Sequence, residues 1–241
     1  MHHTVDIRDL HFTYGDGTRA LNGVNLYIAP GEKVALVGPN GSGKSTLFLH
    51  LNGILRGEGE VFVCGKQVQD DTLGAVRAAV GMVFQDPDDQ LFSQSVFDDV
   101  AFGPIYMGYG PLEVDQRVDR ALKAVGMQSA KGRVSHHLSQ GEKKRVAIAS
   151  VLAMDPEILI LDEPSADLDP RARREFIQLL AELPQTMLVA SHDMHMVAEL
   201  FSRMVIIDKG SIVADGAIAE LMRDTKLLEA HGLEAPCGFN P

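Results

Sequence analysis

A glycine-rich run at residues 38–46 has the residue types that bind phosphate. It fits the pattern G-x-x-x-x-G-K-[ST] and consists of Gly38, Pro39, Asn40, Gly41, Ser42, Gly43, Lys44, Ser45 and Thr46. Glycines let successive backbone N–H groups curl around an anion, and the following helix adds the positive end of its dipole. We expect Lys44 to reach the β- and γ-phosphates of a nucleotide and Ser45 to bind Mg²⁺. The strand before the run and the helix after it are the context that this motif requires.

Two adjacent carboxylates supply a candidate metal ligand and a candidate base. Asp162 and Glu163 follow the apolar run 158–161, and open α/β sheets bind ligands at the carboxyl ends of their strands. Asp162 can hold Mg²⁺ through water, and Glu163 can orient and deprotonate an attacking water. Asp-Glu-Pro could also be a simple polar exit from a strand, but the phosphate-binding run upstream favours the catalytic interpretation.

A third polar group begins a helix. Ser139 and Glu142 stand at the spacing of a capping box, ahead of an apolar helix. Taken alone, this pattern predicts an ordinary helix start. The free N–H groups and the dipole of such a helix also suit a γ-phosphate, so Ser139 and Gly141 are candidate nucleotide contacts.

Buried strands must position the phosphate-binding run and the carboxylates. The short apolar runs at residues 34–37, 158–161 and 187–190 are typical of parallel strands covered on both faces. Between the last two, Asp169 and Pro170 predict a helix start. Strand, helix and strand in this order indicate a parallel sheet.

The remaining segments predict two further parts. Strands are expected at residues 4–12 and 24–28, with hairpins turning at Gly65-Lys66 and Lys209-Gly210. From about residue 88 to residue 153 the pattern becomes helical. There, Pro111 suits a first turn, and apolar residues recur at helical spacing at Val114, Val118, Leu122 and Val125.

Composition excludes some classes of function. A net charge of -11 argues against binding of nucleic acid by a basic surface. No apolar run reaches the length of about 18 residues that a membrane span needs, and Met1 to Thr4 show no signal-peptide pattern. We therefore expect membrane contact through partners only. Cys64 and Cys237 are expected to be free thiols in a reducing compartment.

The order of these motifs resembles that of ATP-binding cassette (ABC) ATPases over about residues 4–225. The segment from Leu138 to Glu142 resembles the signature of this family. Tyr14 is similar to the aromatic that stacks on adenine, and Gln85 is similar to the glutamine that senses Mg²⁺. The segment from Ser165 to Asp169 is similar to the loop at the dimer interface. His192 is similar to the switch histidine at the γ-phosphate. Gln140 and Ser165 depart from the usual glycine and threonine, and we expect altered rates at most.

The resemblance implies a P-loop NTPase (RecA-like) parallel-sheet core, with an N-terminal antiparallel β subdomain and an inserted α-helical subdomain. The ATPase domain would span residues 1–225, with a short C-terminal extension at 226–241. ATP would lie at the interface of a homodimer. Catalytic roles fall to Glu163, His192 and Gln85, and the Mg²⁺ site to Ser45, Gln85 and Asp162. Nucleotide contacts fall to residues 38–46, Tyr14, Ser139, Gly141 and Glu142.

A finer resemblance lies in residues 84–104, which are similar to the ATPases of energy-coupling-factor importers. His136-His137 and the segment from Gly141 to Arg145 resemble the cobalt and nickel branch. The implied partners are a transmembrane scaffold subunit and a substrate-binding membrane subunit, at the cytoplasmic face of the cell membrane. Segment 85–104 would dock on the scaffold through the carboxylates Asp88, Asp89, Asp98 and Asp99 and the apolar Leu91, Phe92, Val96 and Phe97.

Other readings stay open at this point. The importer could carry another solute, such as a vitamin. The chain could also be a soluble ABC ATPase of DNA repair or translation, although Lys44 and Ser139 are too close in sequence for a long coiled-coil insertion. A binding module without catalysis is disfavoured, because Lys44, Glu163 and His192 are all present.

Overall fold

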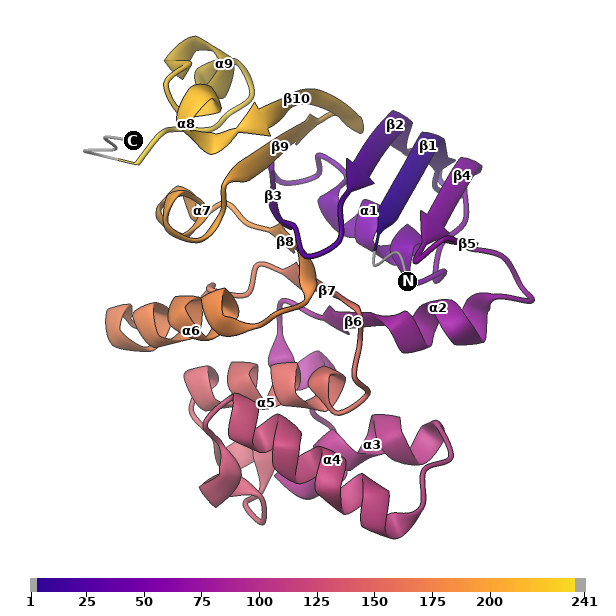
Figure 1. Cartoon of the computed structure of the whole chain (residues 1–241). Helices are drawn as coiled ribbons and strands as arrows, with labels where there is room; N and C mark the ends of the chain where they lie inside the picture. Colours follow the sequence, from indigo (N-terminus) through magenta and orange to yellow (C-terminus); the bar gives the residue numbers. More distant parts are fainter. Residues whose placement is uncertain (1–3, 237–241) are drawn as a thin grey trace. The chain divides into compact units, whose positions relative to one another are not determined.

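A computed structural model describes residues 4–236 of the chain (Figure 1). These residues form two compact units. The core unit holds described residues 4–80, 157–163 and 184–236, and the helical unit holds residues 81–156 and 164–183. The predicted Cys237 thiol lies outside the described residues.

A mostly parallel sheet forms the centre of the core unit. Its strands are β3 (Lys33–Val37), β7 (Ile158–Asp162), β8 (Thr186–Ala190), β9 (Arg203–Asp208) and β10 (Ser211–Ala217), in the order β10-β9-β3-β8-β7. β3 runs parallel to β8 and β9, and β7 runs parallel to β8, whereas β10 pairs antiparallel with β9. The three predicted apolar runs are all buried, which confirms the parallel-sheet prediction.

An antiparallel sheet forms the second layer of strands in the core unit. It contains β1 (Val5–Thr13), β2 (Arg19–Ile28), β4 (Glu58–Val63) and β5 (Lys66–Gln67), in the order β2-β1-β4-β5. The hairpin between β4 and β5 turns at Cys64 and Gly65, one residue before the predicted turn at Gly65-Lys66. β2 starts at Arg19 rather than at residue 24, because its first half alternates irregularly in burial and holds a glycine, which weakens the strand pattern.

Short helices complete the core unit. They are α1 (Lys44–Leu51), α2 (Leu73–Ala79), α7 (Met194–Leu200), α8 (Ile218–Leu221) and α9 (Thr225–Ala230). α1 begins inside the glycine-rich run, as its motif predicts. The others are too short to produce a clear helical period in the sequence. Cys64, between β4 and β5, is a free thiol whose pKa is raised to about 12, chiefly by burial.

The helical unit follows β6 (Val80–Val83) and contains α3 (Val96–Tyr106), α4 (Pro111–Ala124), α5 (Gln140–Leu152) and α6 (Pro170–Glu182). Three short 3-10 helices lie at Pro87–Asp89, Gln128–Ala130 and Ser135–His137. α3, α4 and α5 pack against one another, and Val114, Val118 and Leu122 form the buried stripe of α4. Asp169 caps α6 by accepting from the N–H groups of Arg171 and Ala172, both at 2.9 Å. Among the described residues, no helix is long and apolar enough to cross a membrane.

Candidate functional site

The phosphate-binding run connects the end of β3 to the start of α1. Gly43, the residue before α1, has φ 109°, and a Cβ there would lie 2.6 Å from the carbonyl oxygen of Ala20. At Gly38 a Cβ would lie 2.0 Å from the carbonyl oxygen of Ile207, so this position also excludes a side chain. The Ser42 hydroxyl is buried in the loop and has no hydrogen-bond partner in the structure. The loop backbone therefore packs closely and leaves the Ser42 hydroxyl unpaired. A loop with this geometry can bind a phosphate group.

Lys44 folds back over this loop. Its Nζ donates to the carbonyl oxygens of Gly38 at 2.7 Å and Pro39 at 3.1 Å. Burial lowers the pKa of the ammonium, while Glu163 and Asp162 act against that shift. The loop carbonyls hold the cation in place, and a phosphate is a stronger partner for it than a neutral carbonyl.

Ser45 and Asp162 meet across a long stretch of sequence. The Ser45 hydroxyl donates to the Asp162 carboxylate at 2.7 Å. Burial raises the pKa of Asp162, and the hydrogen bond from Ser45 partly offsets this shift. A hydroxyl and a carboxylate next to a phosphate cradle are oxygen ligands of the kind that Mg²⁺ prefers. The predicted pair therefore fits the ion.

Glu163 and His192 form a second pair. The Glu163 carboxylate accepts from Nδ1 of His192 at 2.8 Å and from the backbone N–H of His192 at 3.2 Å. The Glu163 backbone has φ 43° and donates to the carbonyl of Ala190 at 2.9 Å. Glu163 is buried, whereas the His192 side chain is largely exposed. The carboxylate is thus oriented from two sides, as a positioned base requires.

Tyr14 lies at the other end of the loop. Its hydroxyl is 3.0 Å from the Thr46 hydroxyl, and its ring is partly exposed. Sequence reasoning did not find the residues that support this ring. They are Phe12 and His50, whose rings pack edge-on in the same cluster.

The other predicted residues belong to the helical unit. Ser139 and Glu142 form the predicted capping box of α5: the Ser139 N–H donates to the Glu142 carboxylate at 2.8 Å, and the Glu142 N–H donates to the Ser139 hydroxyl at 3.3 Å. Arg133 also binds this carboxylate, at 2.7 Å. The pKa of Glu142 is lowered, first by the hydrogen bond from the Ser139 N–H.

Gly141 is close to α6: a Cβ built on Gly141 would lie 3.2 Å from the Cβ of Ala172. Gln85 is exposed, and its carbonyl accepts from Lys144 at 3.2 Å.

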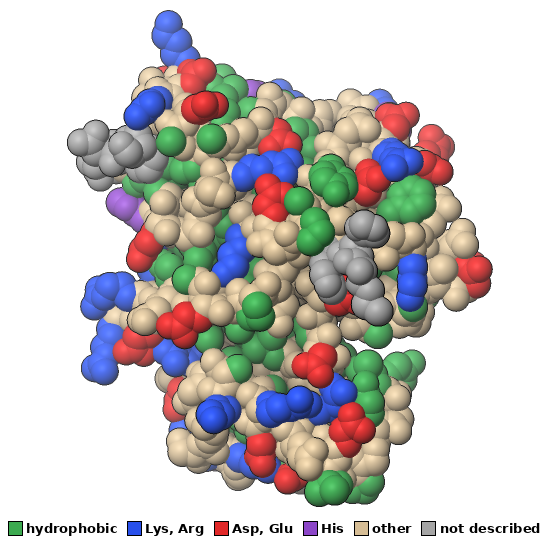
Figure 2. All heavy atoms as spheres, in the orientation of Figure 1, with side chains coloured by type: hydrophobic (Ala, Val, Ile, Leu, Met, Phe, Trp, Pro, Cys, Tyr) green, Lys and Arg blue, Asp and Glu red, His purple; other side chains and the backbone are tan. Residues whose placement is uncertain are grey.

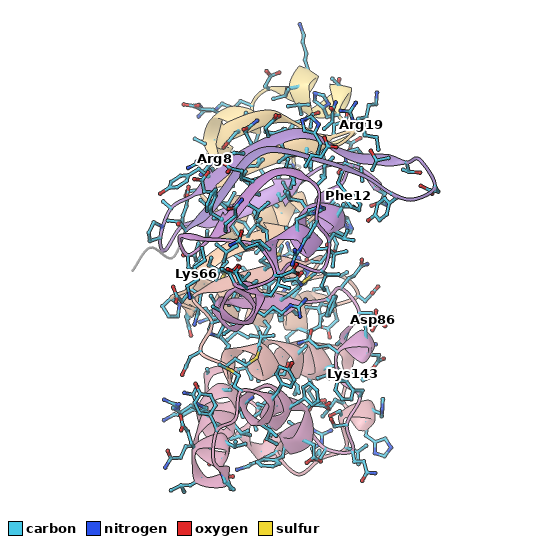
Figure 3. The ribbon with its side chains drawn as sticks, turned by 90° about the vertical axis from the view of Figure 1, so that its right-hand side faces the viewer. Arg8, Phe12, Arg19, Lys66, Asp86 and Lys143 are labelled. Carbon is cyan, nitrogen blue, oxygen red and sulfur yellow. The ribbon has the colours of Figure 1, made fainter. Side chains whose placement is uncertain are left out.

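The prediction that residues 85–104 dock on a scaffold subunit is wrong for some of the residues that it names. Asp99 is 4% exposed and accepts from the N–H groups of Phe92 and Ser93 and from the hydroxyl of Ser135. It therefore ties the start of α3 to a neighbouring loop. Leu91 and Val96 are buried as well. Asp88 is exposed but bonds to Lys143 of α5 at 2.7 Å; Figure 3 labels Lys143.

Known proteins share this arrangement across nearly the whole chain. Residues 21–166, more than half of the chain, match the family described as ABC transporter. The energy-coupling factor transporter ATP-binding protein EcfA of Methanothermobacter thermautotrophicus is 48% identical over 238 residues, or 96% of this chain and 76% of that protein. The chain is an ATP-binding subunit of the ABC transporter family. As an ABC ATPase it binds and hydrolyses ATP.

Further relatives of this ABC ATPase are similar to it in sequence or in fold over most of the chain. The EcfA protein of Methanocaldococcus jannaschii is 46% identical over 238 residues, covering 96% of this chain and 85% of that protein. The structure of cbiO1 from Clostridium perfringens, described as part of the ABC transporter complex cbiONQ, has a TM-score of 0.84 at 40% identity, covering 94% and 93% of the two chains. The cassette MJ0796, a dimer bound to ADP and Pi, has a TM-score of 0.79 at 29% identity, covering 89% and 98%. These structures confirm the predicted fold.

Replacing Glu163 with Gln in this ABC ATPase tests the assignment of the base. Removal of a positioned general base lowers turnover by about 10²–10⁴-fold. We expect Glu163→Gln to retain its affinity for ATP, because the amide keeps the shape of the side chain. Lys44→Ala is the contrasting variant and should also lose affinity, since it removes a cation at the phosphates. Steady-state hydrolysis and equilibrium binding of ATP measure the two effects. Near-normal turnover of Glu163→Gln would overturn the assignment.

Proposed function

We propose that this chain is the ATP-hydrolysing subunit of an energy-coupling-factor importer, and that the importer carries cobalt or nickel. The observation that carries the proposal is the 48% identity to an EcfA protein over nearly the whole chain. The cobalt or nickel assignment is supported by the resemblance of segment 136–145 to that branch. The similarity to cbiO1, part of the ABC transporter complex cbiONQ, supports a role in a transporter complex. A vitamin importer is the second candidate.

In this proposal the core unit carries the chemistry. The loop at residues 38–46 holds the phosphates, and Lys44 turns from the loop carbonyls toward the β- and γ-phosphates. Ser45 and Asp162 would hold Mg²⁺, which neutralises charge on the phosphates when it is bound. Glu163 accepts a proton from the attacking water. His192 orients that carboxylate and contacts the γ-phosphate.

The proposed organisation follows from the same assignment. Residues 1–225 form the ATPase domain, with the helical subdomain at about 88–153, and residues 226–241 form a C-terminal extension. Membrane contact would come only through partners, and the location implied by the family resemblance is the cytoplasmic face of the cell membrane. The partners are a scaffold subunit and a substrate-binding subunit, and nucleic acid is not among them.

Co-purification tests the proposed importer. We expect the tagged chain, extracted from its native membrane in mild detergent, to carry a scaffold protein and a metal-binding membrane protein. In proteoliposomes this complex should take up radioactive cobalt only with ATP, and the complex with Glu163→Gln should not. A vitamin-binding membrane protein in place of the metal-binding one would contradict the cobalt and nickel assignment.

ATP would bind between two copies of the chain. Each copy has one phosphate loop in its core unit and one capped helix, after Ser139, in its helical unit. A closed two-fold dimer can pair the loop of one copy with the helix of the other, and the similarity to the dimeric cassette MJ0796 supports this arrangement.

Sedimentation tests the proposed dimer. The Glu163→Gln variant should be monomeric without nucleotide and dimeric with ATP, because slow hydrolysis preserves the ATP-bound form. Adding Ser139→Arg, which places a bulky cation at the helix start, should restore the monomer. A Glu163→Gln protein that stays monomeric at saturating ATP would count against the model.

An apolar patch on the helical unit is the proposed contact with the scaffold. The α3 patch consists of Phe92, Phe102, Ile105 and Tyr106, whose exposed fractions are 63%, 55%, 60% and 87%. The rings of Phe92 and Phe102 pack edge-on with centroids 5.2 Å apart. Figure 2 shows hydrophobic side chains gathered along the edge of this unit where α3 lies. Exposed clusters of large apolar residues mark interaction surfaces, and aromatic residues dominate their binding energy.

A charge in the α3 patch should weaken assembly. We expect Phe102→Glu to lower recovery of the scaffold in co-purification at least tenfold, because burying one unpaired carboxylate is costly. ATP hydrolysis by the isolated chain should change little. Tyr27→Glu, at an exposed aromatic on β2 of the core unit, is the matched control and should assemble normally. Normal co-purification of Phe102→Glu would refute this docking surface.

A further inference from the structure

A buried histidine lies one turn after the phosphate loop. His50 of α1 is 2% exposed, and its Nδ1 is 2.7 Å from the backbone carbonyl oxygen of Thr46. Because a carbonyl only accepts, Nδ1 carries the proton and Nε2 is the bare nitrogen. Nε2 is buried without a hydrogen-bond partner in the structure, and burial lowers the pKa of the ring. His50 is therefore a neutral imidazole with one nitrogen left over.

The His50 ring belongs to a closed chain of contacts. Phe12 of β1 packs edge-on against His50, with centroids 4.9 Å apart and an interplanar angle of 76°. On its other side Phe12 packs edge-on against Tyr14, at 4.9 Å and 84°. The Tyr14 hydroxyl returns to the Thr46 hydroxyl at 3.0 Å. We call these four residues the Thr46 cluster; Figure 3 labels Phe12 on the antiparallel sheet.

A purely structural role explains this cluster poorly. A buried nitrogen without a hydrogen-bond partner lowers stability. An apolar side chain at position 50 would fill the same space in the core without that loss of stability. The ring edges, in contrast, connect α1 to β1 at the point where Tyr14 leaves the strand. Edge-to-face contacts constrain the orientation of each ring, beyond the area that they bury.

We propose that His50 is a positioning residue for nucleotide binding. Through Phe12 and Thr46 it holds the Tyr14 ring in the place where adenine stacks. This inference rests on the proposed function, in which Thr46 is part of the phosphate loop, and on the resemblance of Tyr14 to the aromatic that stacks on adenine. The ring of His50 is connected through Phe12 to Tyr14, so we expect it to act on the affinity for the base and not on the hydrolytic step.

The test compares binding of ATP with binding of inorganic tripolyphosphate, which lacks the base. We expect His50→Leu to raise the Kd and KM for Mg-ATP about 2- to 10-fold, the range of one lost aromatic contact. The kcat should stay within about twofold, and the Kd for Mg-tripolyphosphate should not change. Phe12→Leu should have the same selective effect, and it serves as the second variant if His50→Leu does not fold. Phe48→Leu, at a buried ring of α1 outside the cluster, is the control and should affect neither ligand.

The outcomes separate this inference from the proposed function. Equal weakening of both ligands in His50→Leu and Phe12→Leu, or no weakening in either variant, overturns the positioning role. Tyr14→Ala decides the other question. If Tyr14→Ala binds Mg-ATP as tightly as the unchanged chain does, then the adenine assignment of Tyr14 is wrong, whatever His50 does.

Discussion

The strands β3, β7 and β8 run parallel and end at one edge of the sheet, and the polar groups proposed to bind phosphate, metal and water follow those ends. The phosphate loop follows β3, the carboxylates of Asp162 and Glu163 come at the end of β7, and His192 follows β8. The pairing of β7 with β8, and of β8 with β3, brings Ser45 to within 2.7 Å of Asp162. Antiparallel pairing would send alternate strand ends to opposite edges and separate these groups.

Once gathered at this edge, the charged groups influence one another. Lys44 is buried near Glu163 and Asp162, so its charge is disfavoured by burial and favoured by two carboxylates. Asp162 is likewise destabilised as an anion by burial. Within the described core unit, loop carbonyls, the Ser45 hydroxyl and the His192 ring serve as partners for these three groups. Bound phosphate and metal would compete for the same side chains, which links binding to a rearrangement of the site.

The helical unit uses its polar residues differently. Asp99 binds N–H groups of the loop before α3, Glu142 binds the N–H of the Ser139 cap of α5, and Asp88 pairs with Lys143. These side chains hold the ends of helices, while the α3 patch leaves large aromatic rings at the surface. Helices whose starts are held by hydrogen bonds, with an apolar edge, suit the proposed docking of a partner protein, because less ordering is needed on binding.

Features that depend on neighbours in sequence could be predicted from the sequence alone. Short-range rules of backbone geometry and burial explain the phosphate loop, the buried strands, the capping box of Ser139 and Glu142, Pro111 in the first turn of α4 and the Asp169 cap of α6. Only the tertiary structure decided which carboxylates are exposed and can contact a partner protein, since burial depends on what packs over a residue. The sequence predicts that Asp99 is exposed like its neighbour Asp98. In the structure it is buried and accepts a hydrogen bond from Ser135, which lies far along the chain. The contacts of Glu163 with His192 and of Phe12 with His50 likewise join distant segments, and no local pattern encodes them.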